Sequence, residues 1–389
     1  MQYSNTTEVE RVGKIIESFL DQPLMTNIMD SDPPLYKAYK TLFDKTINEL
    51  AFQNSNNNNN NNKNQLLSPS SPPSAVTVDE CELPLIDLSR LSLGEAAERE
   101  ECKSQIARAS REWGFFQVIN HGISKGLLEE VRSEQEKVFK EPFEKKSQED
   151  KYLKFSAGSY RWGTPTATCL GQLSWSEAFH IPLHSISSPN DNANHHNNTD
   201  HFRSTVEQFA KTVSNLALKL AEILAEKVGH DPSYFKENCL PSTCYLRMNR
   251  YPPCPVPSDV FGLMPHTDSD FLTILLQYNV GGLQLVKDGK WIAVKPNPDA
   301  LIINIGDLFQ AWSNDVYKSV EHRVVTNAHV ERFSTAYFLC PSYDTVLDSG
   351  LEPSVYTKFS FREYRRQVQD DVTNLGFKIG LRRFLNATS

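Results

Sequence analysis

The chain has 389 residues, of which 39% are hydrophobic and 23% charged, a balance typical of a globular protein. Its formal charge is −8, from 40 Lys and Arg against 48 Asp and Glu, which argues against binding to nucleic-acid phosphates. The seven cysteines form no C-x-x-C pattern, no stretch resembles a membrane span, and charged residues precede the first apolar run. We therefore expect a protein of the cytosol, with passive access to the nucleus and without nucleic-acid or membrane partners, while protein partners stay unknown.

The first 80 residues predict two segments of different character. Residues 1–52 show helical spacing of apolar side chains, as at Leu35 and Tyr39, and predict a helical leader. Residues 53–80 contain an unbroken run of asparagines and then a Ser- and Pro-rich stretch, which bury too little apolar surface to offset the entropy of ordering. We therefore predict a disordered linker over 53–80, and we expect removal of residues 1–75 to leave activity within a few-fold.

Residues 81–186 are expected to form the N-terminal region of the folded protein. Residues 187–200 read SSPNDNANHHNNTD and predict a polar surface loop. Residues 205–228 carry their apolar side chains on one face and predict a long amphipathic helix that ends at Gly229. Within the N-terminal region, the predicted elements are a strand at 83–87, a helix at 102–113 and a strand at 114–119.

Short strands with turns between them dominate the next part of the chain, as in an all-β barrel or jelly roll. We therefore predict an α+β fold, in which a distorted double-stranded β-helix, or jelly roll, has flanking α-helices. Residues 201–345 would hold the long helix and this core, and residues 346–389 would form a C-terminal helical segment with a helix over 360–380. The candidate strands are 243–251, 271–277, 282–286, 291–294, 300–305, 319–325 and 332–339.

Three residues in this region predict a metal site. His266 and Asp268 are two positions apart, so their side chains face the same way in an extended chain. His322 lies in the predicted strand 319–325. Two histidines and one carboxylate form the facial triad of non-haem Fe(II) oxygenases. Catalytic zinc also uses three protein ligands, so the triad alone leaves iron and zinc open.

Arg332 and Ser334 predict a carboxylate-binding fork. They share one face of a predicted strand, ten residues after His322. A guanidinium beside a hydroxyl binds a carboxylate well, and a buried arginine without an acidic neighbour in its own strand needs an anion from elsewhere. A dicarboxylic keto acid would chelate the metal at one end and reach Arg332 at the other.

The strand at 243–251 alternates polar and apolar side chains. If Leu246 and Met248 pack against helices, then Arg247, Asn249 and Tyr251 line the cavity. The alternative is that the polar face of this strand lies against solvent. The two prolines that follow Tyr251 should end the strand, because proline donates no hydrogen bond to a neighbour.

Together these motifs resemble the 2-oxoglutarate- and Fe(II)-dependent dioxygenases of plants. The resemblance covers about residues 83–385 and rests on H-x-D, on His322 at 56 positions after His266, and on R-x-S ten residues further. It also rests on N-x-Y-P-P from Asn249 and on WGFFQVINHG from Trp113. Four further segments are similar to the gibberellin 2-oxidases, and within them to the branch associated with C20 precursors: 156–165, 173–180, 245–254 and 306–314.

The resemblance implies 2β-hydroxylation of a gibberellin, which is a diterpenoid acid, with O2 and 2-oxoglutarate, and the resemblance to the C20 branch implies a C20 precursor. Succinate and CO2 would be released, and the hormone pathway would be inactivated. Ascorbate is the reductant that such enzymes imply. Arg332 is the residue that we class as catalytic. The implied ligands are His266, Asp268 and His322 for Fe(II), and Asn249, Tyr251, Arg332 and Ser334 for 2-oxoglutarate.

Contacts with the substrate are expected from two places in the chain. Arg247 is the candidate anchor for a substrate carboxylate, because it lies two residues before Asn249 on the same strand face. The segment Tyr160, Arg161 and Trp162 is the second candidate, unless Arg161 is a surface residue stacked on Trp162. Two other functions stay open: a sister dioxygenase acting on a flavonoid or other specialised metabolite, and a cupin-like protein that binds metal and ligand without turnover.

Overall fold

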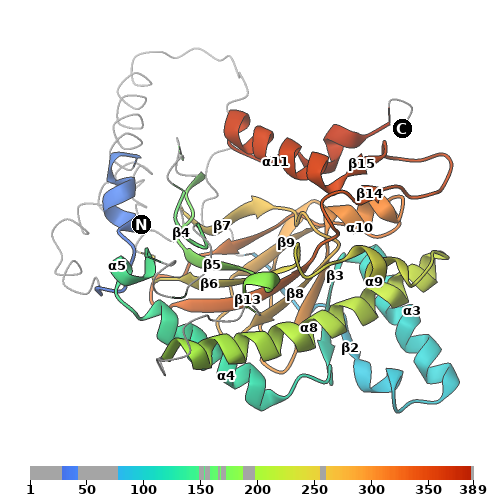
Figure 1. The fold of residues 1–389 in the computed structure, drawn as a ribbon, viewed down its shortest axis with the longest axis horizontal. Coiled ribbons are helices and arrows are strands. Elements are labelled where there is room, and N and C mark those ends of the chain that lie inside the picture. The colour runs from blue at the N-terminus through green and yellow to red at the C-terminus, as the bar shows by residue number, and fades with distance from the viewer. Residues whose placement is uncertain are drawn as a thin grey trace, which may run out of the picture.

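A computed structural model describes residues 29–42, 78–148, 153, 158–164, 167, 172–186, 198–254 and 260–386. Two mainly antiparallel sheets form its centre (Figure 1). The larger sheet has the order β2 (Leu85–Asp87), β3 (Phe115–Ile119), β11 (Leu301–Ile305), β8 (Leu272–Gln277), β13 (Arg332–Leu339), β6 (Tyr245–Tyr251), β5 (Glu177–Pro182) and β4 (Tyr160–Trp162). The smaller sheet has the order β1 (Glu80–Cys81), β10 (Lys290–Val294), β9 (Leu283–Lys287), β12 (His322–Val325) and β7 (Phe261–His266).

Helices cover the outer face of the larger sheet. Helices α4 (Lys125–Phe139) and α8 (Asn198–Val228) run across it, and α3 (Ala96–Glu112) packs beside them (Figure 1). The apolar face of α8 packs against apolar side chains of β13 and β8, and this contact forms part of the main core. α8 ends at Gly229, whose φ of 79° lies in the left-handed region that glycine adopts without strain.

The C-terminal elements lie on the other side of the sheets from α8 (Figure 1). α11 (Phe361–Leu375) begins with a capping box between Ser360 and Glu363 and ends at Gly376, which has a φ of 81°. The remaining elements are short: η2 (Leu88–Leu91), α5 (Phe143–Lys146), α7 (Leu183–Ile186), α9 (Tyr234–Asn238), α10 (Asp307–Trp312), β14 (Val346–Leu347), β15 (Phe359–Ser360) and η4 (Gly380–Phe384).

The predicted jelly-roll core with flanking helices is confirmed, and each of the seven strands predicted between 243 and 339 is present. β6 ends at Tyr251 as predicted, since two prolines follow it. β7 was not predicted, because its glycine, methionine, proline and histidine are poor strand formers. Strands from the N-terminal region, β2 to β5, complete the larger sheet rather than forming a separate unit.

Several predicted boundaries differ from those of the structure. α8 begins at Asn198, inside the predicted loop 187–200, where polar residues form its first turn. The predicted helix over 360–380 ends at Leu375, because Gly376 takes the left-handed conformation. The predicted linker reached residue 80, but β1 already pairs with β10 there. Its residues up to 77, and 187–197 of the loop, lie outside the described residues.

Part of the predicted leader packs against the barrel. Residues 35–42 are helical, and Leu35 and Tyr39 are 3% and 2% exposed. The Tyr39 hydroxyl donates to the Ser174 carbonyl at 3.2 Å and joins the leader to the segment before β5. Removing residues 1–75 would uncover this apolar contact, and the expectation that activity then stays within a few-fold remains a prediction.

A buried ion network joins the same leader segment to β5 and β6. Lys146 Nζ lies 2.6 Å from Glu177 Oε2, and both side chains are fully buried. Arg250 Nη1 lies 2.7 Å from Glu177 Oε1, and its other nitrogens reach Asp32 at 2.8 Å and Glu331 at 2.9 Å. The network fixes the ends of the strands that carry Tyr251 and Arg332. Among the described helices, none is long and apolar enough to cross a membrane.

Candidate active site

A cavity of about 250 Å3 opens inside the barrel and is lined by strands of both sheets. The residues predicted from the sequence to bind metal, keto acid and substrate carboxylate gather here, although they come from four different strands and one loop. The predicted residues that line it are Arg247, Asn249, Tyr251, His266, Asp268, His322, Arg332 and Ser334.

The three candidate metal ligands meet at one point of this cavity. His266 ends β7 and is paired across the sheet with His322 of β12. Asp268 follows in the loop after β7, and its Oδ1 lies 3.6 Å from His266 Nε2 and 3.7 Å from His322 Nε2. All three ligand atoms lie within 4.8 Å of one another, and no other such group occurs in the described part of the chain.

Hydrogen bonds orient each ligand. Nδ1 of His266 lies 2.7 Å from the Met264 carbonyl, and Nδ1 of His322 lies 3.0 Å from the Val320 carbonyl. Each Nδ1 therefore carries the proton that it donates to this carbonyl, which leaves both Nε2 lone pairs directed at the common point.

Two residues that were not predicted from the sequence hold Asp268. Its Oδ2 accepts hydrogen bonds from Thr273 Oγ1 at 2.6 Å and from Asn304 Nδ2 at 2.8 Å, so Oδ1 stays available. In the sequence, Asn304 and Thr273 are noticeable only as polar residues inside mostly apolar strands, which does not indicate a contact with Asp268. Such partners around a ligand typically tune metal affinity.

The protonation states suit a divalent cation. Burial, with the nearby His322, lowers the pKa of His266 to about 3. Burial opposes ionisation of Asp268, but the two histidines and its hydrogen bonds lower the pKa of this carboxyl below its usual value. A neutral imidazole and an ionised carboxylate are the forms that bind metal.

Arg332 supplies an uncompensated positive charge at the other end of the cavity. Its side chain is 3% exposed, and Nη2 donates to Gln277 Oε1 at 3.1 Å. Nε and Nη1 are buried without a hydrogen-bond partner, and no carboxylate of the described residues pairs with this guanidinium. Ser334 lies on the same strand face, and the Tyr251 ring lies 5.0 Å from the guanidinium. Two unused donors on a buried cation fit a carboxylate brought by a ligand.

Helix α4 braces the strands behind this fork. Gln135 is fully buried, and its Nε2 donates to the carbonyls of Asn249 at 3.1 Å and Ser334 at 2.9 Å. Asn249 Nδ2 in turn lies 3.4 Å from Ser334 Oγ. Gln135 was not predicted from the sequence, since its contacts lie more than a hundred residues away.

Comparison with known proteins identifies the family. Residues 242–341 match the 2OG-Fe(II) oxygenase superfamily, and residues 83–202 match the N-terminal region of the non-haem dioxygenases in morphine synthesis. The chain belongs to the 2-oxoglutarate–Fe(II) oxygenases. Both groups fit the residues present: the His-Asp-His donor set suits Fe(II), and the two unpartnered donors of Arg332 suit the far carboxylate of 2-oxoglutarate.

Individual relatives cover nearly the whole chain. Gibberellin 2-beta-dioxygenase 8 of Arabidopsis thaliana is 60% identical over 91% of this chain and 99% of its own. Gibberellin 2-beta-dioxygenase 6 of rice (Oryza sativa subsp. japonica) is 51% identical over 92% of this chain and 97% of its own. Among solved structures, JOX2 in complex with 2OG, Fe and JA has a TM-score of 0.62 at 31% identity, over 78% of this chain and 90% of that one.

The predicted substrate residues of this oxygenase divide between the two faces of the larger sheet. Arg247 lines the cavity, and its Nε donates to Asn249 Oδ1 at 2.8 Å. Arg161 is exposed, and it is aligned through Ala178 with Asn249, so it lies on the cavity face at the sheet edge.

Tyr160 and Trp162 lie on the opposite face, because side chains alternate along a strand. The Tyr160 hydroxyl donates to Glu177 in the buried ion network, and Trp162 packs edge-on against Phe143 at 5.6 Å. The structure therefore does not bring these two side chains to the cavity.

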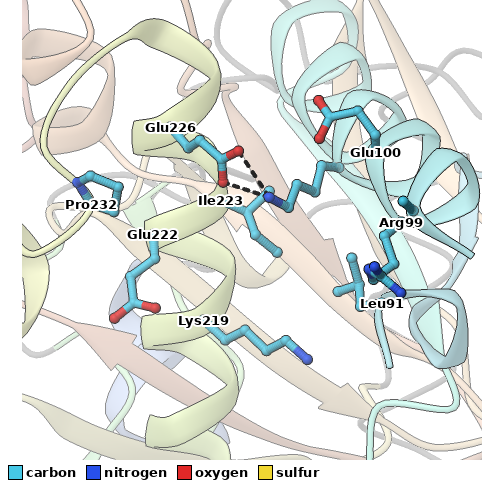
Figure 2. Close-up of a pocket in the computed structure, with 10 residues that line it drawn as sticks. Leu91, Arg99, Glu100, Lys219, Glu222, Ile223, Glu226 and Pro232 are labelled. Atoms are coloured by element: carbon cyan, nitrogen blue, oxygen red, sulfur yellow. Dashed lines mark hydrogen bonds and ion pairs between the residues drawn. The ribbon is translucent and has the colours of Figure 1, made fainter. Parts of the chain in front are cut away.

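A second hollow, of about 410 Å3, lies at the surface between α3 and α8 (Figure 2). Its charged side chains pair with one another: Lys103 Nζ lies 2.7 Å from Glu226 Oε2, and Lys227 pairs with Glu100. Among the described residues the metal-binding group is the one in the smaller cavity, and none of the residues that line this hollow lines that cavity, so we assign the chemistry to the smaller cavity.

Proposed function

We propose that this oxygenase is a gibberellin 2-oxidase. It hydroxylates the 2β position of a gibberellin, with a C20 precursor as the preferred skeleton, consumes O2 and 2-oxoglutarate, and releases succinate and CO2. The product no longer serves the hormone pathway. The observation that carries this proposal is the 60% identity with a gibberellin 2-beta-dioxygenase over nearly the full length of both chains.

The residue roles follow from the geometry of the cavity. Fe(II) and 2-oxoglutarate, when bound, supply the oxidising chemistry, in which the keto acid loses CO2 and one oxygen atom enters a C–H bond. The proposed ligands of Fe(II) are His266, Asp268 and His322, and those of 2-oxoglutarate are Arg332, Ser334, Asn249 and Tyr251.

The protein's own contribution is orientation and the exclusion of water. The triad would hold Fe(II) through three protein ligands, and the remaining coordination positions would be open to exchangeable ligands. Arg332 holds the far carboxylate of 2-oxoglutarate, so the keto-acid end of 2-oxoglutarate is directed at the triad. Leu275, Leu283 and Val324 also line the cavity and keep the reacting region apolar.

An aromatic and cationic wall supports a rigid apolar acid as substrate. The Tyr245 ring stacks on Phe338 at 4.4 Å and lies 4.2 Å from the His180 ring. Burial, with nearby arginines, lowers the pKa of His180 to about 4, so His180 is neutral at cellular pH. The positive charge beside this wall therefore comes from Arg247, Arg161 and Arg365. We propose Arg247 as the anchor of the substrate carboxylate, with Arg161 as a second cation on the same face.

Two accessory points belong to the same proposal. Ascorbate serves as the reductant that returns iron to Fe(II) after unproductive oxidation. The protein works in the cytosol, where a small acid substrate is available without a membrane partner.

Product analysis with purified full-length protein tests the function. Fe(II), 2-oxoglutarate, ascorbate and air are supplied with C20 gibberellins, C19 gibberellins or a flavanone, and Asp268→Ala is the matched inactive control. We expect a 2-hydroxylated C20 product with an equal amount of succinate. Turnover of the flavanone alone would support the sister dioxygenase, and ligand binding without succinate from any substrate would support a non-catalytic protein.

A further inference from the structure

The loop that carries Asp268 is held from outside by the C-terminal segment. Lys378 Nζ donates to the Thr267 carbonyl at 2.9 Å and to Ser269 Oγ at 2.9 Å, one residue on either side of Asp268. The same nitrogen lies 2.8 Å from Asp307 Oδ2. The Lys378 side chain is 11% exposed, so these contacts are shielded from water.

Asp307 joins several pieces of chain at this point. Its backbone N–H donates to the Asp268 carbonyl at 2.9 Å. Its carboxylate accepts from Thr267 Oγ1 at 3.1 Å and from Ser319 Oγ at 2.6 Å, and also from the Tyr364 hydroxyl. Ser319 precedes the strand that carries His322. One carboxylate therefore connects both metal-binding segments to α11 and to Lys378.

The segment around Lys378 is itself fixed. Asp371 of α11 is 2% exposed, and its carboxylate accepts from Arg383 Nη2 at 2.9 Å and from the Ile379 N–H at 3.4 Å. A Cβ at Gly380 would lie 3.1 Å from Asp307 Oδ2, so the chain passes close to this carboxylate. These contacts fix the turn after α11, and this turn places Lys378 against the loop that carries Asp268.

We propose that Lys378 is a positioning residue for the metal centre. It does not touch the metal; it acts by fixing the loop 267–270, which has no strand partner of its own, so that Asp268 is held at the point where His266 and His322 converge. Partners around metal ligands typically contribute 10- to 100-fold in metal affinity. This inference rests on the Fe(II) assignment in the proposed function, and it does not depend on which substrate is oxidised.

Metal affinity of the full-length protein tests the proposal. Fe(II) is titrated anaerobically in the presence of 2-oxoglutarate, and the metal-to-keto-acid absorption band is followed for wild type, Lys378→Met and Lys378→Arg. Lys295→Met is the matched control, because Lys295 makes a surface pair with Glu82 at 2.7 Å and does not line the cavity. We expect Lys378→Met to raise the Fe(II) Kd by about 10-fold or more. Lys378→Arg should keep most of the wild-type affinity for Fe(II), and Lys295→Met should have the Kd of wild type.

Equal Fe(II) Kd values for Lys378→Met and wild type would overturn the proposal. An equally large rise in the Fe(II) Kd of Lys295→Met would also overturn it. If Lys378→Met does not fold, Ser269→Ala decides, because it removes the hydroxyl through which Lys378 holds the loop side chain and leaves Lys378 in place. A raised Kd in that variant supports the proposal, and an unchanged Kd refutes it. Failure of the proposed function has a different signature: wild type forms the absorption band but makes no hydroxylated gibberellin.

Discussion

Replacing Lys146 with methionine should reveal how strongly the buried ion network stabilises the fold. Lys146 is fully buried and donates to Glu177 at 2.6 Å, to the Ser31 carbonyl at 2.7 Å and to the Phe139 carbonyl at 2.8 Å. Methionine fills similar space but donates no hydrogen bond. The variant therefore leaves one buried carboxylate short of a partner and two carbonyls without a donor.

The size of the effect follows from these contacts. Removing one partner of a buried ion pair typically costs about 3–5 kcal/mol. Glu177 keeps Arg250 at 2.7 Å, which reduces the loss, while the two orphaned carbonyls increase it. We therefore expect Lys146→Met to lower the free energy of unfolding by about 3–4 kcal/mol.

Urea unfolding of the full-length protein measures this loss as a shift of the transition midpoint. Lys137→Met is the matched control on α4: Lys137 pairs with Glu134 at 2.6 Å, but its side chain is 65% exposed, and such pairs contribute less than about 1 kcal/mol. Equal midpoints for the two variants would refute the claim that the network stabilises the protein.

Three further predictions concern the cavity. Arg332→Met should raise the KM for 2-oxoglutarate by about 30-fold or more, because it removes a buried partner of a carboxylate. Steady-state succinate assays measure this KM, and an unchanged value would show that Arg332 does not bind 2-oxoglutarate. Arg247→Ala should raise the gibberellin KM and leave the 2-oxoglutarate KM nearly intact, and the opposite pattern would disprove the anchor. The pKa of His180 is about 4 in the folded state against a usual 6.5, so the unfolded chain binds the extra proton and stability should fall as the pH drops from about 6.5 to 4. His180→Asn should flatten this slope in urea unfolding at several pH values, and an unchanged slope would assign the proton uptake to other groups.

Much of the cavity was predictable because strand alternation is regular. A period of two residues places Arg247, Asn249 and Tyr251 on one face, and the structure has this face lining the cavity. The same rule pairs Arg332 with Ser334. The catalytic and binding roles of these residues stay predictions until the variants are measured.

Other parts could not be predicted because they depend on contacts between distant residues. Neither the sequence around Lys146 nor that around Glu177 indicates a buried pair, and only the fold brings β5 beside α5. The leader contact of Tyr39 joins residues 135 positions apart. Motif similarity predicted that Tyr160 and Trp162 contact the substrate, whereas the strand register places them on the face opposite to the cavity.

The shared larger sheet affects how the protein folds as it is synthesised. β3 pairs with β11, whose residue Leu301 lies opposite Val118, and β5 pairs with β6. When β3 has just been synthesised, β11 does not yet exist, so the edge of β3 that will pair with β11 is open. This open strand carries the apolar side chains of Phe115 and Phe116. Such unpaired edges are prone to aggregation. The edge of β3 therefore stays open until β11 has been synthesised, and shortening the chain to the segment 242–341 would expose β6 and β11 as open edges.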